Sequence, residues 1–126
     1  MISEKQQKAI DTFVKVFKGS HQAVSNNQYK IFDSKKTLIA YAIVEVSHNL
    51  IYKAYPLIIN THTLSGLVKK RLSPVVIWCC DDGIIYGKVT QMYGQIKWGK
   101  DIPHSVNTDL MCYYEKQKAF KYIKFI

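Results

Sequence analysis

The carboxylate best placed for chemistry in this sequence is Glu45. It lies near the C-terminal end of residues 37–46, where it is the exception in an otherwise apolar stretch. Asp33 is a weaker second candidate, because it opens the polar segment 33–36, which is typical of a tight turn. The ordinary alternative for Glu45 is an ion pair with a nearby lysine such as Lys53.

The other residue types that build catalytic or metal sites show no recognisable spacing. Neither the four histidines nor the three cysteines follow a zinc-binding pattern. Cys79 and Cys80 are adjacent in an apolar run, so on a strand they point to opposite faces and cannot easily share one ion. We interpret them as reduced cysteines of the core. We therefore expect no cofactor and no confident metal ligand, with Glu45 as the ligand if there is one.

Positive charge is the better functional signal. The 126 residues include 18 lysines and arginines against nine acidic residues, which gives a net charge of +9. Such an excess favours an anionic partner, and nucleic acid is the commonest of these. The alternative is a protein whose lysines are simply solvated. The candidate nucleic-acid contacts fall into four groups: Lys35 with Lys36, Lys53 alone, Lys69 with Lys70 and Arg71, and Lys97 with Lys100.

The hydrophobic pattern predicts helices and strands in one domain, residues 1–126. Ser3 and Gln6 form a capping-box pattern before an apolar stripe that ends near Gly19, which predicts a first helix. A second predicted helix stands between two apolar strands, which requires a crossover and a mixed sheet. The remaining predictions are loops over 20–28 and 93–110, strands over 29–32, 37–46, 75–80 and 84–92, a helix over 57–70, a hairpin turn at 81–83, and short strands over 111–114 and 119–126 around a basic turn.

Three stretches of the chain carry a family pattern. They are KTLIAYAIVEVSHNLIYKAYPLIINTHTLSGLVKK at 36–70, SPVVIWCCDDGIIYGKV at 73–89 and WGKDIPHSVNTDLMCYY at 98–114. Together they resemble the small, often phage-encoded PD-(D/E)XK nuclease-like family. The resemblance covers roughly residues 25–115. It implies an α/β (α+β) fold with a restriction-endonuclease-like αβββαβ core, a mixed central sheet and a β-rich C-terminal tail.

The active-site motif that this resemblance implies is incomplete. In the family, carboxylates hold Mg²⁺, which polarises the phosphate, and a lysine two residues after the strand glutamate steadies the developing charge. If Glu45 is the motif glutamate, Ser47 replaces the lysine; if Glu45 stands at the lysine position, Ile43 replaces the glutamate. The upstream aspartate usually comes where this chain has Asn-Asn-Gln at 26–28. A strand-end carboxylate, a vestigial ligand and a working ligand all remain open for Glu45.

The resemblance and the charge together imply a catalytically degenerate nuclease-like binding protein, phage- or virus-encoded. It would contact nucleic acid or inhibit an acidic host defence or nucleic-acid-processing factor. The alternative is an active Mg²⁺-dependent endo- or exonuclease in which Lys53 or Lys36 replaces the missing lysine. A homo-oligomer, a dimer for example, formed by edge pairing of apolar strands is a third hypothesis. No segment has the pattern of a signal peptide or a membrane span, so we expect a cytoplasmic protein, in the host cytosol if it is viral.

Overall fold

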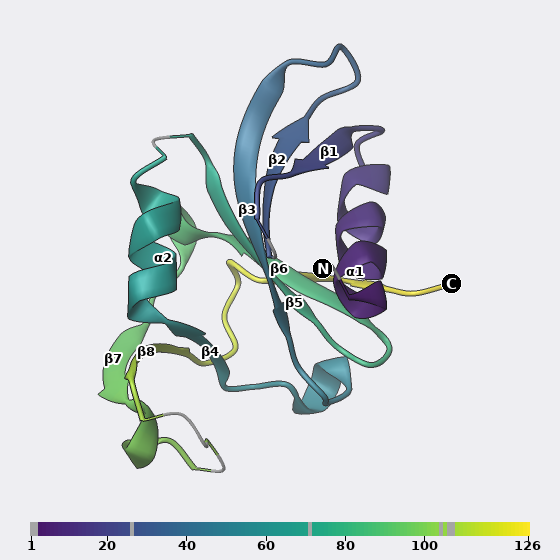
Figure 1. Cartoon of the computed structure of the whole chain (residues 1–126). Helices are drawn as coiled ribbons and strands as arrows, with labels where there is room; N and C mark the ends of the chain where they lie inside the picture. The colour runs from purple at the N-terminus through teal and green to yellow at the C-terminus, as the bar shows by residue number, and fades with distance from the viewer. Residues whose placement is uncertain (1–2, 26, 71, 104, 106–107) are drawn as a thin grey trace.

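The chain forms an α+β structure with a six-stranded mixed sheet and a three-stranded sheet (Figure 1). The computed structural model describes residues 3–25, 27–70, 72–103, 105 and 108–126. No helix among these residues combines the length and apolarity needed to cross a bilayer. Their elements are α1 (Glu4–Lys15), β1 (Ser20–Ala23), β2 (Gln28–Phe32), β3 (Leu38–Val46), the 3-10 turn η1 (Ile51–Lys53), β4 (Leu57–Asn60), α2 (Thr61–Val68), β5 (Pro74–Cys79), β6 (Gly83–Lys88), the 3-10 turn η2 (Val89–Gln91), β7 (Gln95–Trp98), the 3-10 turn η3 (Gly99–Asp101), β8 (Leu110–Tyr114) and β9 (Lys121–Lys124).

The parallel pair β3 and β5 forms the middle of the large sheet. The strand order is β1-β2-β3-β5-β6-β9, and every other neighbouring pair is antiparallel. The register runs from Tyr41 opposite Pro74 to Val46 opposite Cys79. β4 and α2 carry the chain from the end of β3 back to the start of β5. The predicted crossover and mixed sheet are therefore confirmed.

Two separate hydrophobic cores lie on the two faces of the large sheet. α1 covers one face, while α2 and the small sheet, of order β4-β8-β7, lie on the other (Figure 1). Cys79 belongs to the core under α1, and Cys80 belongs to the opposite core. The two side chains thus lie on opposite faces, as alternation along a strand predicts, and both thiols are free and buried. Burial raises the pKa of each thiol, that of Cys80 to about 12.

The first helix begins as predicted and ends for a different reason. The Ser3 hydroxyl accepts a hydrogen bond from the Gln6 backbone N–H at 3.2 Å, and the Gln6 side chain accepts one from the Ser3 N–H at 3.3 Å. The left-handed residue after the helix is Lys18, with a φ of 56°, and not the predicted Gly19. Gly19 is needed because a Cβ there would lie 2.4 Å from the carbonyl oxygen of Phe32.

Several predicted element boundaries are wrong. The predicted helix over 57–70 is β4 followed by α2, and the change comes at Asn60, whose side chain accepts hydrogen bonds from the backbone N–H groups of His62 and Thr63. The predicted loop over 20–28 contains β1, and the predicted loop over 93–110 contains β7. The strand predicted over 84–92 ends at Lys88. The last two strands do not pair with each other, because β8 joins the small sheet and β9 joins β6.

The attachment of β9 to β6 depends on Gly83. A Cβ at Gly83 would lie 2.3 Å from the carbonyl oxygen of Ile123 and 2.7 Å from Cα of Lys124, both of which are backbone atoms of β9. We expect Gly83→Ala to lower the free energy of unfolding by about 2 kcal/mol or more, measured by urea denaturation. Gly66→Ala is the matched control, because its Cβ position inside α2 meets no described atom within 4 Å apart from its chain neighbours and the backbone of its own helix. This substitution should stabilise the protein by about 0.5–1 kcal/mol. An unchanged midpoint for Gly83→Ala would contradict this account of the strand pair.

Candidate functional site

A cavity of about 450 Å³ opens at the C-terminal end of β3. Parallel pairing brings the ends of β3 and β5 to the same edge of the sheet, where the chain after each strand turns away. Hydrogen bonds hold these two segments together: Ser47 N donates to Cys79 O at 2.8 Å, and Asp81 N donates to Asn49 O at 3.0 Å. The cavity is lined by Glu45, Val46, Ser47, His48, Asn49, Ala54, Pro56, Leu57, Ile58, Trp78, Ser105 and Met111.

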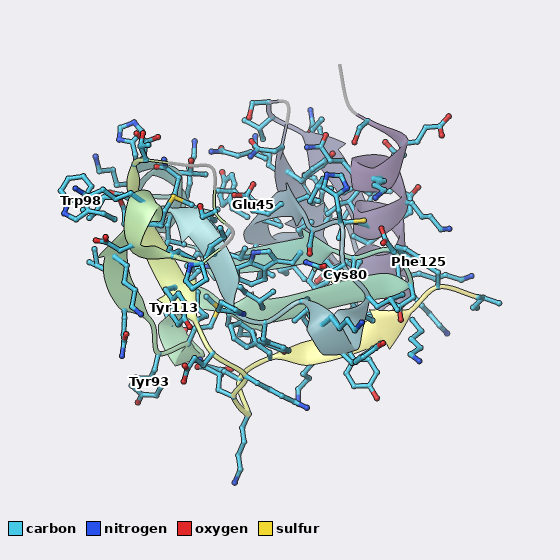
Figure 2. All side chains as sticks on the ribbon, turned by 90° about the horizontal axis from the view of Figure 1, so that it is seen from below. Glu45, Cys80, Tyr93, Trp98, Tyr113 and Phe125 are labelled. Carbon is cyan, nitrogen blue, oxygen red and sulfur yellow. The ribbon has the colours of Figure 1, made fainter. Side chains whose placement is uncertain are left out.

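Glu45 is the carboxylate of this cavity among the described lining residues. It projects from the same face of β3 as Ile43, toward the side of the sheet that carries the small sheet, and Figure 2 shows it in the space between the two sheets. The side chain is half-buried, and this desolvation raises the pKa of Glu45, while a hydrogen bond from the Asn27 side chain lowers it by a smaller amount. Ser47 lines the same cavity two residues later. Glu45 thus stands in a partly desolvated site, with the Asn27 amide beside it.

A lysine from α1 reaches a residue that lines the cavity. Lys5 Nζ lies 3.5 Å from Nδ1 of His48, which lines the cavity, and forms an ion pair of 3.1 Å with Asp81. The expected partner Lys53 instead lies with its Nζ 5.5 Å from the centre of the Tyr52 ring. Among the described residues, Lys53 makes no ion pair with Glu45, so the predicted Glu45–Lys53 pair is wrong.

Asp33 and Glu45 do not share a site. Asp33 opens the β2–β3 turn, where its Oδ1 accepts hydrogen bonds from the backbone N–H groups of Lys35 and Thr37, both at 2.9 Å. From Leu38 at the start of β3, Glu45 is seven residues away, roughly 23 Å at the rise of a strand. The geometry therefore gives Asp33 a turn-forming role and leaves Glu45 without it.

The predicted nucleic-acid contacts do not gather around the cavity. Lys35 and Lys36 lie in the turn before β3, and Lys69 and Lys70 lie just after α2, so all four stand at the end of the sheet opposite Glu45 (Figure 1). Lys70 Nζ lies 5.6 Å from the centre of the Tyr41 ring. Lys53 is the last residue of η1, directly before Ala54 of the cavity lining. Lys97 and Lys100 belong to β7 and the turn after it, and Arg71 lies outside the described residues.

The donor set at Glu45 does not fit a Mg²⁺ site. Mg²⁺ prefers oxygen ligands that bring negative charge, in near-octahedral geometry. Here one carboxylate is accompanied by Asn27, whose amide donates to it, and by the hydroxyl of Ser47. Among the described residues, no three side chains of His, Cys, Asp or Glu converge in a way that could hold a metal ion. The chemistry of this donor set, one charge among neutral groups, is that of hydrogen bonding.

Two residues of the site were not singled out by sequence reasoning. Asn27 was considered only as a replacement for an aspartate, and it comes beside Glu45 because β2 pairs with β3 in the register Gln28 opposite Ile43. Lys5 reaches His48 from a helix 43 residues earlier in the chain. No local pattern marks Lys5, since only the packing of α1 across the sheet brings it there.

The raised pKa of Glu45 gives a testable dependence of stability on pH. Because burial disfavours the carboxylate in the folded chain, ionising Glu45 costs stability above its folded-state pKa, and this cost is absent below its ordinary value of 4.5. Glu45→Gln removes the cost and keeps an oxygen that accepts from Asn27. The variant should be more stable than the wild type at neutral pH, and the difference should vanish below pH 4.5, as measured by urea denaturation.

The control for this experiment is Glu115→Gln, which removes one negative charge from an exposed position. It corrects for the change in net charge alone. A stability difference for Glu45→Gln that is equally large at both pH values would show that ionisation of Glu45 is not its cause.

Comparisons of this chain with family models, with curated proteins and with solved structures found no match.

Proposed function

We propose that this chain is a catalytically degenerate PD-(D/E)XK nuclease-like protein that binds nucleic acid without cutting it. The observation that carries the proposal is the cavity at the end of β3, where Glu45 stands beside Asn27 and Ser47 follows it two residues later. If Glu45 is taken as the motif glutamate, Ser47 would stand in place of the lysine and Asn27 in place of the second carboxylate. The element order of α1, the meander β1-β2-β3, the crossover through α2 and the parallel strand β5 supports a restriction-endonuclease-like αβββαβ core.

The charge of the chain supports nucleic acid as the partner. A net charge of +9 attracts a polyanion, and lysines stand on several sides of the molecule. A half-buried carboxylate in the cavity does not oppose this, because one acid among many lysines changes the long-range field little. An acidic host protein would be attracted by the same field, and we treat it as an outcome of the binding test.

The first test is binding without cleavage. Fluorescence polarisation with labelled single- and double-stranded oligonucleotides should show retention at low salt, with affinity falling at least about tenfold between 50 and 200 mM salt. Gel electrophoresis of the same oligonucleotides after incubation with Mg²⁺ or Mn²⁺ should show them intact. Cleavage that Glu45→Ala abolishes would establish the active nuclease, and absence of retention at low salt would rule out nucleic acid and direct the search to a protein partner by pull-down.

The second test rebuilds the lost carboxylate. Asn27→Asp places a second acid beside Glu45, so the like charges should repel and lower the melting temperature. Mg²⁺ should restore much of that loss in the variant, because a divalent cation bridges two carboxylates and stabilises the state that binds it. The same addition should leave the wild type and the double variant Asn27→Asp/Glu45→Gln nearly unchanged. A wild type that Mg²⁺ stabilises as strongly would contradict degeneracy and favour the displaced-ligand nuclease.

A further inference from the structure

Two exposed tyrosines and two lysines form one surface at the end of the large sheet where β6 begins. We call it the tyrosine–lysine surface, and its members are Tyr52, Lys53, Tyr122 and Lys124. The tyrosines are 71% and 63% exposed, which is unusual for such large aromatic side chains. Tyr52 and Lys53 come from η1, and Tyr122 and Lys124 come from β9. The surface therefore joins two segments that lie far apart in the sequence.

The contact between η1 and β9 is close. The position of a Cβ on Gly83 lies 2.8 Å from Cδ1 of Ile51 and 2.7 Å from Cα of Lys124, so η1 sits directly beside the end of β9. Asp82 anchors both segments: its Oδ1 accepts from Ile51 N at 2.9 Å, and its backbone oxygen accepts from Phe125 N at 2.9 Å. The relative position of η1 and β9 is thus fixed through Asp82, by one hydrogen bond to its carboxylate and one to its backbone oxygen.

The strand register places the side chains of β9 on the same side of the sheet as η1. Tyr122 is paired with Ile85, and Lys124 is paired with Gly83. Ile85 belongs to the core that also contains Ile51. Since paired residues share a face, Tyr122 and Lys124 point toward the side on which η1 lies.

Cations dominate the chemistry of this surface. Lys53 Nζ lies 5.5 Å from the centre of the Tyr52 ring. Residues 116–124 contain four lysines and no acidic residue, and residues 50–56 contain one lysine and no acidic residue. The acids of the adjacent β5–β6 turn are engaged, Asp81 by Lys5 and Asp82 by Ile51 N. Among the described residues, no carboxylate forms an ion pair with Lys53 or Lys124, so the surface presents aromatic rings beside lysines that are free to contact phosphates.

This chemistry suits single-stranded nucleic acid better than other occupants. Exposed rings offer stacking platforms to unpaired bases, and lysines beside them contact phosphates. The lysines along β9 discourage pairing with a further strand, which disfavours a second copy of the chain. The tyrosines carry polar hydroxyls, whereas insertion into a membrane surface needs a broader apolar face.

We propose that the tyrosine–lysine surface binds single-stranded nucleic acid, with bases stacked on Tyr52 and Tyr122 and phosphates held by Lys53 and Lys124. The inference rests on the proposed function and adds where the strand binds and in which form. The surface adjoins the Glu45 cavity, because Ala54, which lines that cavity, directly follows Lys53. A strand bound here would therefore lead toward the cavity.

The test compares three sets of variants by fluorescence polarisation with labelled oligothymidylate and with a duplex of equal length. Tyr52→Ala/Tyr122→Ala should weaken binding of the single strand at least about tenfold and weaken the duplex much less. Tyr52→Phe/Tyr122→Phe should bind normally, because the rings remain. Lys53→Ala/Lys124→Ala should reduce the slope of log affinity against log salt by about two.

The matched control comes from the competing aromatic and basic cluster on the small sheet. Trp98 is 53% exposed and is flanked by Lys97 and Lys100 on β7 and the turn after it, and Figure 2 shows it at the far side of the small sheet. Trp98→Ala should leave single-strand affinity within about twofold, because its ring lies outside the tyrosine–lysine surface. Urea denaturation of each variant confirms that it is folded.

The possible outcomes separate this inference from the proposed function. If the wild type binds nucleic acid and Tyr52→Ala/Tyr122→Ala binds equally well, the assignment of binding to the tyrosine–lysine surface is wrong. The proposed function then stands. If the wild type binds no nucleic acid, both are overturned. An equal loss for single strand and duplex would reject stacking, and tighter, tyrosine-dependent binding to phosphatidylserine vesicles would assign the surface to a membrane instead.

Discussion

The parallel pairing of β3 and β5 is the constraint on which the rest of the structure depends. Two parallel neighbours cannot be joined by a short turn, so the chain must cross one face of the sheet between them. Here that crossover is β4 with α2, and β4 recruits β8 and β7 into the small sheet. Both central strands are then covered on two faces, which explains why their residues are almost entirely apolar. The same pairing places the ends of β3 and β5 together, and the cavity with Glu45 is the result.

Sequence patterns predicted the elements whose own residues determine them. β3 and β5 are long apolar runs, α1 begins at a capping box, and the turns at 33–36 and 81–83 contain residues that form turns locally. β1 and β7 escaped prediction because they are short, exposed edge strands held by backbone pairing rather than by buried side chains. β4 was predicted as helix because its apolar run of three residues, 57–59, has no clear periodicity.

The residues of the candidate site also divide into those that local sequence predicts and those that only the fold brings together. Glu45 could be placed at a strand end from the apolar run around it, whereas the other residues of the site come from distant parts of the chain. Asn27 arrives through the register of β2, and Lys5 arrives through the packing of α1. The lysine groups show that a net charge of +9 does not by itself make a patch: Lys36 and Lys70 stand at one end of the sheet, and Lys53 stands at the other. A basic composition predicts an anionic partner, but only topology decides which cations act together.

The two adjacent thiols at the end of β5 give the molecule a pair of built-in reporters. The Cys79 thiol becomes exposed to solvent only when α1 separates from the large sheet. The Cys80 thiol becomes exposed only when the layer of α2 and the small sheet separates from it. Burial keeps both protonated and unreactive while their layers stay closed. Their alkylation rates under native conditions therefore time the opening of each layer separately. Unequal rates at these two consecutive residues would reveal which of the two layers separates from the large sheet more often.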